Sequence, residues 1–207
     1  IPRDCGEKEP RQVFARENSR TMAVSAPLLQ LGIKGQPAEG GAAQLRQRLL
    51  GELACEALAG NSSPLYNRLY EKGLINSSFY LGYMDYPGCA FLVAGGETKD
   101  PEGVRDAILQ EGKRIAEEGM EEAFFQRLKK AAYGAYVRGL NSFETLCVEQ
   151  AQGYFAEQNP WTFPEIYDAL TRQDVEEFLR VWIKPEQTSL IVIWPEEAGK
   201  WNLIMIF

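Results

Sequence analysis

The stretch Asn61–Phe79 constrains the fold most, because it combines a helix start, a short helix, a helix stop and the entry to a strand. Ser62 or Ser63 can accept hydrogen bonds from the free N–H groups of a first helical turn, where Pro64 removes no hydrogen bond. Gly73 suits the left-handed conformation that follows many helices. The stretch therefore predicts a sharp corner between a short amphipathic helix and an aromatic strand.

Hydrophobic periodicity predicts the elements on both sides of this corner. Apolar residues recur every fourth position from Leu45 to Ala57, which indicates a long helix packed on a sheet. Asp85–Gly88 has the composition of a turn between two strands. Pro27 cannot donate to a strand ladder, so its strand is expected at a sheet edge or bulged there. The predicted strands are 13–15, 22–33, 77–86, 89–94 and 189–194, and the predicted helices are 42–59, 64–72, 101–118, 121–140, 142–155, 164–170 and 174–182.

This order of elements predicts an α+β fold. Strands and helices come in runs without strict alternation, which favours a mainly antiparallel sheet of about five or six strands with helices on one face. One domain is expected over residues 1–207, with 1–10 as a linker remnant and 195–207 as a tail of unassigned role. The residues predicted to form the buried core are Leu49, Leu53, Phe79, Phe91, Val93, Phe124, Leu128, Leu190 and Val192.

Histidine is absent from the chain. It is the commonest zinc ligand and the usual general base, so the chain alone is expected to bind no cofactor and to cleave no peptide. The four cysteines are far apart in sequence and form no CxxC pair. They are interpreted as reduced thiols of a cytoplasmic protein.

Charge and hydropathy exclude two further classes of partner. The net charge of −7 argues against nucleic acid binding. No apolar run reaches the roughly 20 residues that a membrane span needs, so no membrane partner is expected.

Four segments carry a resemblance to a known family. They are 62–75 (SSPLYNRLYEKGLI), 91–104 (FLVAGGETKDPEGV), 139–143 (GLNSF) and 170–175 (LTRQDV). In this order they resemble the second half-unit of pitrilysin- or insulinase-type zinc metallopeptidases, which include the mitochondrial processing peptidase. Within this family, the segments resemble those of bacterial processing-peptidase-like proteins.

The resemblance implies a division of labour between two similar domains that face each other around a peptide chamber. In the family, an H-x-x-E-H motif in the first domain supplies the zinc site. The chain is therefore expected to be the non-metal, C-terminal half, with zinc in a missing N-terminal half. Its expected partners are that catalytic half and a peptide substrate.

The resemblance also points to candidate substrate-binding residues. Second halves of the family often hold substrate with an arginine and a tyrosine, and the matching positions here are Tyr70 and Asn76. Because both depart from the pattern, helix-end packing and a strand-entry turn are the favoured interpretation. A related second subunit is then the expected source of an Arg/Tyr pair. Tyr80 and Tyr83 lie on an aromatic strand, one face of which can contact a peptide.

Two alternatives to the peptidase half remain open. The chain can be an inactive scaffold, similar to the core subunits of respiratory complexes. It can also be a stand-alone module that binds peptides through its aromatic strand or a sheet edge.

Overall fold

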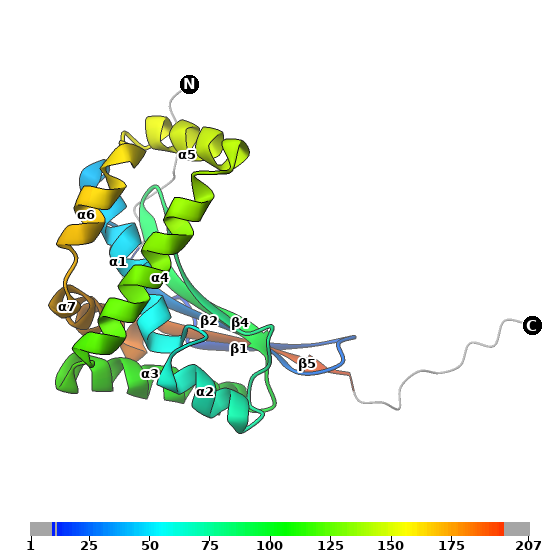
Figure 1. The fold of residues 1–207 in the computed structure, drawn as a ribbon. Helices are drawn as coiled ribbons and strands as arrows, with labels where there is room; N and C mark the ends of the chain where they lie inside the picture. Colours follow the sequence, from blue (N-terminus) through cyan, green and yellow to red (C-terminus); the bar gives the residue numbers. More distant parts are fainter. Residues whose placement is uncertain (1–9, 11, 197–207) are drawn as a thin grey trace, which may run out of the picture.

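The computed structural model, described here for residues 10 and 12–196, contains one five-stranded sheet and a set of helices (Figure 1). The strands are β1 (Glu17–Met22), β2 (Leu28–Gly35), β3 (Tyr80–Tyr86), β4 (Cys89–Glu97) and β5 (Thr188–Pro195). The α-helices are α1 (Ala42–Ala59), α2 (Pro64–Glu71), α3 (Pro101–Glu118), α4 (Glu122–Gly139), α5 (Phe143–Phe155), α6 (Phe163–Ala169) and α7 (Arg172–Trp182). Short 3-10 turns occupy Pro160–Thr162 and Pro185–Gln187. Of the tail expected at 195–207, Pro195 is the last residue of β5. Residues 197–207 lie outside the described residues.

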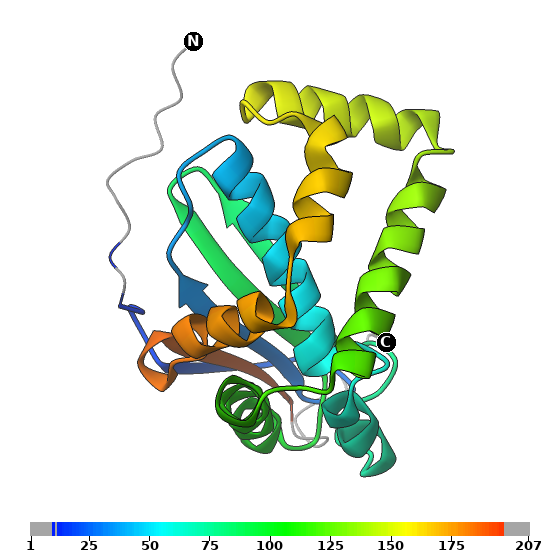
Figure 2. The same ribbon diagram turned by 60° about the vertical axis from the view of Figure 1, so that its left-hand side comes forward.

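The strand order is β1-β5-β2-β4-β3. All neighbouring strands are antiparallel except β1 and β5, which run parallel. Helices α1, α3 and α7 contact one another and lie against one face of the sheet, as Figure 2 shows. The predicted α+β class, with a mainly antiparallel sheet and helices on one face, is confirmed.

The core lies between the sheet and this helix layer. Alternate residues of the three central strands point into it, as the pleat of a strand requires. From the helix side, Leu49 and Leu53 of α1 are buried against them. The strand residues that form the core are Leu29, Leu31, Ile33, Ala90, Leu92, Ala94, Leu190 and Val192.

Three of the nine predicted core residues are only partly buried. Phe91 and Val93 alternate with the buried Ala90, Leu92 and Ala94, so they point to the helix-free face of the sheet. The strand is apolar on both faces, and its composition alone did not reveal which face meets the helices. Phe124 likewise lies beside the core, and the fully buried residue is its neighbour Phe125. The prediction that these three residues are buried is wrong, whereas the other six are buried.

The first two strands also differ from their prediction. The segment 22–33 is not one strand, because β1 ends at Met22 and β2 begins at Leu28. The predicted strand 13–15 is absent, and β1 lies just after it. All six β1 residues are exposed, so the strand is held by its ladder with β5 rather than by burial, and no apolar alternation marks it.

Pro27 does not mark a sheet edge. It precedes β2, which is a central strand between β5 and β4. Its carbonyl oxygen accepts a hydrogen bond from the Thr98 N–H at 3.0 Å. Proline is tolerated here because it stands outside the ladder, and the prediction of an edge or bulged strand is wrong.

The corner around α2 forms as the sequence predicts. The Ser63 hydroxyl oxygen accepts a hydrogen bond from the Tyr66 N–H at 3.1 Å. After the helix, Gly73 has a φ of +64° and the Leu74 N–H donates to the Leu69 carbonyl oxygen at 3.0 Å. These contacts satisfy free backbone groups at both ends of an eight-residue helix.

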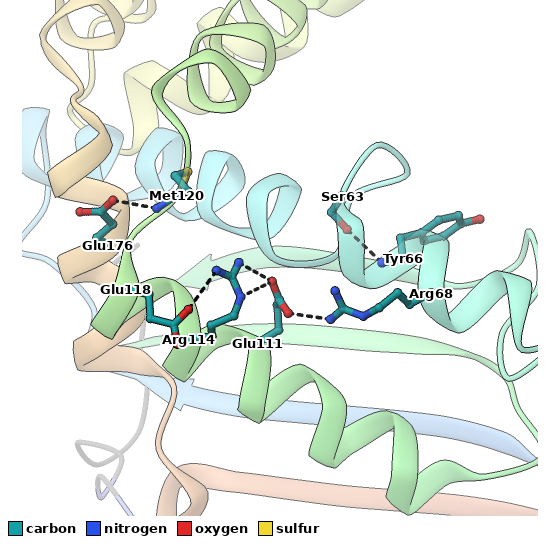
Figure 3. A network of polar contacts seen from close by, with 8 residues as sticks. All are labelled: Ser63, Tyr66, Arg68, Glu111, Arg114, Glu118, Met120 and Glu176. Atoms are coloured by element: carbon teal, nitrogen blue, oxygen red, sulfur yellow. Dashed lines mark hydrogen bonds and ion pairs between the residues drawn. The ribbon is translucent and has the colours of Figure 1, made fainter.

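A buried carboxylate fixes this corner to α3. Glu111, only 5% exposed, accepts hydrogen bonds from Arg68 of α2 at 2.7 Å and from Arg114 at 2.7 and 3.1 Å (Figure 3). Beyond the end of α3, Glu176 of α7 accepts a hydrogen bond from the Met120 N–H at 3.1 Å. Charged groups thus join α2 to the middle of α3, and α7 to the segment that follows α3.

The one-sided core predicts opposite effects for two neighbouring residues of β5. Leu190 is 2% exposed and Ile191 is 43% exposed. Leu190→Ala should lower the free energy of unfolding by about 2–5 kcal/mol, because it removes buried methyl groups and leaves a cavity. Ile191→Ala, the control of equal carbon number, should cost about 1 kcal/mol or less. Urea denaturation measures both values, and equal losses would contradict the assignment of faces.

The ion cluster at Glu111 predicts a dependence of stability on pH. Burial raises the pKa of Glu111, but hydrogen bonds from Arg114 and Arg68 outweigh it and lower the pKa below its ordinary value of 4.5. Such a group stabilises the fold above its unfolded-state pKa, and that contribution is lost as the pH falls through the folded-state pKa. Glu111→Gln should therefore reduce the free energy of unfolding at pH 7 by about 1.5–3 kcal/mol. The variant should also lose less stability than the wild type during acidification below pH 4.5.

The exposed Glu118, at 3.7 Å from Arg114, supplies the control. Glu118→Gln should change stability by less than about 1 kcal/mol. If both variants behave alike in denaturation at pH 7, Glu111 does not fix α2 to α3.

Candidate peptide-binding site

Strand β3 lies at one end of the sheet. Among the strands that the structure describes, it is hydrogen-bonded only to β4, and α1 lies against its helix-side face. The other edge of β3 therefore offers backbone N–H and C=O groups that a further strand can pair with.

The two tyrosines predicted on this strand point to opposite faces. Tyr80 lies on the helix-free face, 48% exposed, and its hydroxyl oxygen accepts a hydrogen bond from Gln30 at 3.4 Å. Tyr83 points into the helix layer, with its ring 5.6 Å from that of Trp182 and its hydroxyl 3.2 Å from Gln47 Oε1. The structure does not bring Tyr80 and Tyr83 together on one surface.

An exposed strip on the helix-free face contains the other large side chains of this strand. Met84 and Tyr86 are exposed beside Tyr80, and the ring of Tyr86 stacks on Phe91 of β4 at 6.2 Å. The aromatic surface of β3 therefore consists of Tyr80 and Tyr86, without Tyr83.

Tyr70 and Asn76 both make local contacts. The Tyr70 ring stacks on that of Tyr66 one helical turn earlier, at 5.9 Å between centroids. The Asn76 amide donates to Glu97 at 2.8 Å, and its oxygen accepts from the Ser78 N–H at 2.8 Å. These contacts fit helix-end packing and a strand-entry turn.

A cavity of about 870 Å³ adjoins β3 on the helix side. Helices α4, α5 and α6 form an arch that stands beside α1, as Figure 2 shows. The cavity lies between this arch, α1 and β3, and its volume is within the range of small-ligand pockets. Its apolar lining includes Leu49 and Leu53 of α1, Ala131 and Ala135 of α4, and Leu81 of β3.

A polar stripe on α1 faces the cavity region. Gln44, Arg48, Glu52 and Glu56 follow one another at intervals of four residues, which places them on one side of the helix. Asp85 of β3 accepts hydrogen bonds from Gln44 at 2.6 Å and from Arg48 at 3.1 Å. The carboxylate of Asp85 thereby holds the Arg48 guanidinium at the end of β3.

The cavity walls change the acidity of several groups. Water reaches the Glu52 side chain, yet the surrounding walls remove much of its solvation and raise the pKa of its carboxyl group. Arg48 opposes this rise in pKa, and Asp85 adds to it. Burial also raises the pKa of Tyr167, at the cavity wall, to about 12.

Arg48, Glu52 and Asp85 are the residues that the sequence analysis missed. The signal that could have found Arg48 and Glu52 is the four-residue interval of polar side chains on a helix that is otherwise mostly apolar. No such signal marked Asp85, because it was interpreted as part of the turn between two strands.

A zinc site does not fit the residues present. The chain has no histidine, and the described residues include no group of three cysteine, aspartate or glutamate side chains that could hold a metal ion. The helices in the described part of the chain include none long and apolar enough to cross a membrane.

Comparison with solved structures supports the fold. The chain is similar to an M16-like peptidase of Alicyclobacillus acidocaldarius, with a TM-score of 0.86 and 18% identity over 92% of this chain and 46% of that one. It is also similar to a peptidase M16 inactive domain from Pseudomonas fluorescens, with a TM-score of 0.72 and 14% identity over 97% of this chain and 48% of that one.

Sequence comparison agrees with the structural one. The chain is 28% identical over 194 residues to the uncharacterized zinc protease YmfH of Bacillus subtilis. The aligned region covers 91% of this chain and 44% of YmfH. The chain therefore spans about half the length of the relatives that it matches. The family model described as the peptidase M16 inactive domain matches residues 5–132. On this match, which includes α1, the α2 corner, the β3–β4 hairpin and α3, the chain belongs to the peptidase M16 inactive-domain family.

Proposed function

We propose that this domain is the non-catalytic half of a zinc-dependent endopeptidase and closes a peptide-binding chamber opposite a zinc site made by another half. The observation that carries the proposal is the family membership of a histidine-free chain that spans about half of its relatives. A half of this kind contributes surface and positioning rather than a metal ligand.

The open edge of β3 is the surface that this role requires. An extended peptide that adds to the edge gains main-chain hydrogen bonds, which tolerate many sequences. The cavity beside Leu81 and the exposed ring of Tyr80 then lie on the two sides of such an added strand. In this role the domain holds the substrate backbone while the zinc half supplies the water that attacks it.

An Arg/Tyr pair for the zinc site has to come from elsewhere. Tyr70 stands where the family's arginine is expected, and Asn76 is bound to Glu97 and Ser78. Donors near the developing oxyanion typically contribute a few kcal/mol to such a reaction. We infer that a related second subunit supplies this pair, and that the zinc half of the present protein supplies the metal.

A scaffold role is the second candidate. The observation that favours it is a structural similarity, with a TM-score of 0.70 and 15% identity, to a chain of complex III2 from Candida albicans. In that case the fold would support an assembly without cleaving peptides.

The peptidase proposal predicts a metal-free domain that increases the activity of a zinc half. The purified 207-residue chain should contain no stoichiometric zinc by elemental analysis and should cleave no fluorogenic peptide. The reason is that it has neither histidine nor paired cysteines, and the carboxylates that remain prefer harder cations than zinc. Added to the separately purified zinc-binding half of the same protein, it should raise peptide cleavage at least about tenfold. A further rise is expected when a related second subunit is added.

Three results would separate the alternatives. Chelator-sensitive cleavage by the pure chain would refute the division between halves. A zinc half that is fully active alone would refute the need for this domain. Binding of the two halves without any cleavage would favour the scaffold role.

A further inference from the structure

Helix α5 exposes the apolar side of an amphipathic helix. At about 100° per residue, all of its apolar side chains except Leu146 fall within an arc of about 140°. The residues of this arc, called the α5 face here, are all exposed: Phe143, Cys147, Val148, Ala151, Tyr154 and Phe155. On the other side of α5, Gly153 lies against Pro160, and Glu149 and Gln152 line the cavity. The pattern of α5 is thus the reverse of that of a helix that covers a core.

The α5 face is large enough for a protein interface. Phe143, Tyr154 and Phe155 are 82%, 80% and 72% exposed, more than any other large apolar side chain in the described residues except Phe14. At roughly 150–250 Å² per aromatic side chain, these three leave about 350–600 Å² in contact with water. With Val148 and the small residues between them, the face approaches the roughly 800 Å² that each partner buries in a stable complex. Exposed apolar patches of this size mark interaction surfaces.

The order of side chains along the α5 face makes it complementary to itself. Phe143 stands at one end, and Tyr154 and Phe155 stand at the other. The small Cys147 and Ala151 lie between them. An antiparallel two-fold axis at the level of residue 149 brings Cys147 opposite Ala151 of a second copy. The same axis brings Phe143 beside Tyr154 and Phe155 of that copy. One symmetry operation therefore matches both the large and the small parts of the face, as an isologous interface requires.

Charge sets the conditions for such a pairing. Residues 139–171 contain five acidic residues and no lysine or arginine, so two copies of this segment repel each other. Only one of the five, Glu144, lies within the arc of the α5 face. In the antiparallel arrangement the two Glu144 residues are about 15 Å apart along the helix axis. This distance exceeds the screening length of about 8 Å at physiological ionic strength, so added salt should tighten the pairing.

From this geometry we propose that the α5 face is an interaction surface whose partner is a second copy of this chain. Two α5 helices pack antiparallel, and the aromatic rings at the ends of one face cover those of the other. Cys147 and Ala151 in the middle let the two helices approach closely. The inference does not depend on the proposed peptidase function.

Sedimentation equilibrium of the purified chain tests the pairing. At roughly tens of micromolar the chain should sediment at about twice its mass of 23.3 kDa. Phe155→Glu should raise the dissociation constant of the dimer at least about tenfold, because it removes an aromatic anchor and adds charge to an acidic surface. Val181→Glu adds the same charge at an exposed apolar position of α7, which lies apart from α5 in Figures 1 and 2. This control should leave the dissociation constant nearly unchanged.

A disulfide between two chains tests the antiparallel register. Cys5 and Cys89 are changed to serine in both chains. One chain keeps Cys147, and the other carries Cys147→Ser and Ala151→Cys. The register places these two thiols opposite each other, with Cα atoms within the range of about 4.4–6.8 Å that a disulfide spans, so mild oxidation should link the chains. With Gln152→Cys in place of Ala151→Cys, the second thiol lies on the cavity side of α5 and should give at least about tenfold less linked dimer.

Each contrary result overturns the pairing. A chain that stays monomeric at these concentrations would refute a second copy as the partner. If Phe155→Glu then weakens binding to the zinc half, the α5 face belongs to the contact between halves instead. A dimer that survives Phe155→Glu, or that forms the two disulfides equally well, uses another surface. The disulfide test holds even if Phe155→Glu fails to fold, because both of its chains keep Phe155. The proposed function is tested separately, by the cleavage measured after mixing the two halves.

Discussion

Burial of one face of the sheet by α1 and α7 is the constraint on which the rest of the structure depends. The contact is close enough that a side chain at either of two glycine positions would displace a buried ring. A Cβ on Gly35 would lie 2.2 Å from the ring of Trp182, and one on Gly51 would lie 2.4 Å from the ring of Tyr83. These distances fix α7 against β2 and α1 against β3. Residues of β2 and β3 on the covered face point inwards, and their neighbours along the strand point outwards.

The same layer explains why the candidate site lies where it does. Helices α1, α3 and α7 cover the sheet, so α4, α5 and α6 stand further out as an arch (Figure 2). Ala131, Ala132 and Ala135 of α4 line the space beside α1 with short side chains. A cavity then remains at the open edge of β3, where the sheet has no further neighbour among the described strands. The site is thus a consequence of how the helices divide between the sheet and the arch.

Local signals in the sequence predicted the helices well and the strands less well. Ser63 accepts a backbone hydrogen bond at the start of α2, which it was expected to cap, and Asp100 and Ser142 accept equivalent bonds at the starts of α3 and α5. α7 begins two residues earlier than predicted, because Thr171 and Asp174 form a capping box. Capping depends on a few adjacent residues, so a single sequence contains the information. Fold class and family were accessible for a similar reason, because the order of these local signals is distinctive.

The faces and edges of the sheet depend on segments that are distant in the sequence, so local patterns did not predict them. Val93 and Leu92 are both apolar, and the side on which the helices pack decides which one is buried. β1 has no hydrophobic pattern, because its ladder with β5 uses backbone groups that every residue has. The residues that line the cavity were not predicted for the same reason. Arg48 and Asp85 are 37 positions apart, and their pairing needs the hairpin to fold against α1.

The two tasks of a peptidase place different demands on a sequence. A zinc site needs a small set of particular ligands in one geometry, and a chain without histidine cannot supply the usual ones. Holding an extended peptide needs only an open strand edge and a nearby recess, which follow from the fold itself. In this domain Asp85 neutralises Arg48, so the charge that remains in the recess comes from glutamates. An open edge and a recess of this kind depend on where β3 and α1 lie rather than on any one side chain.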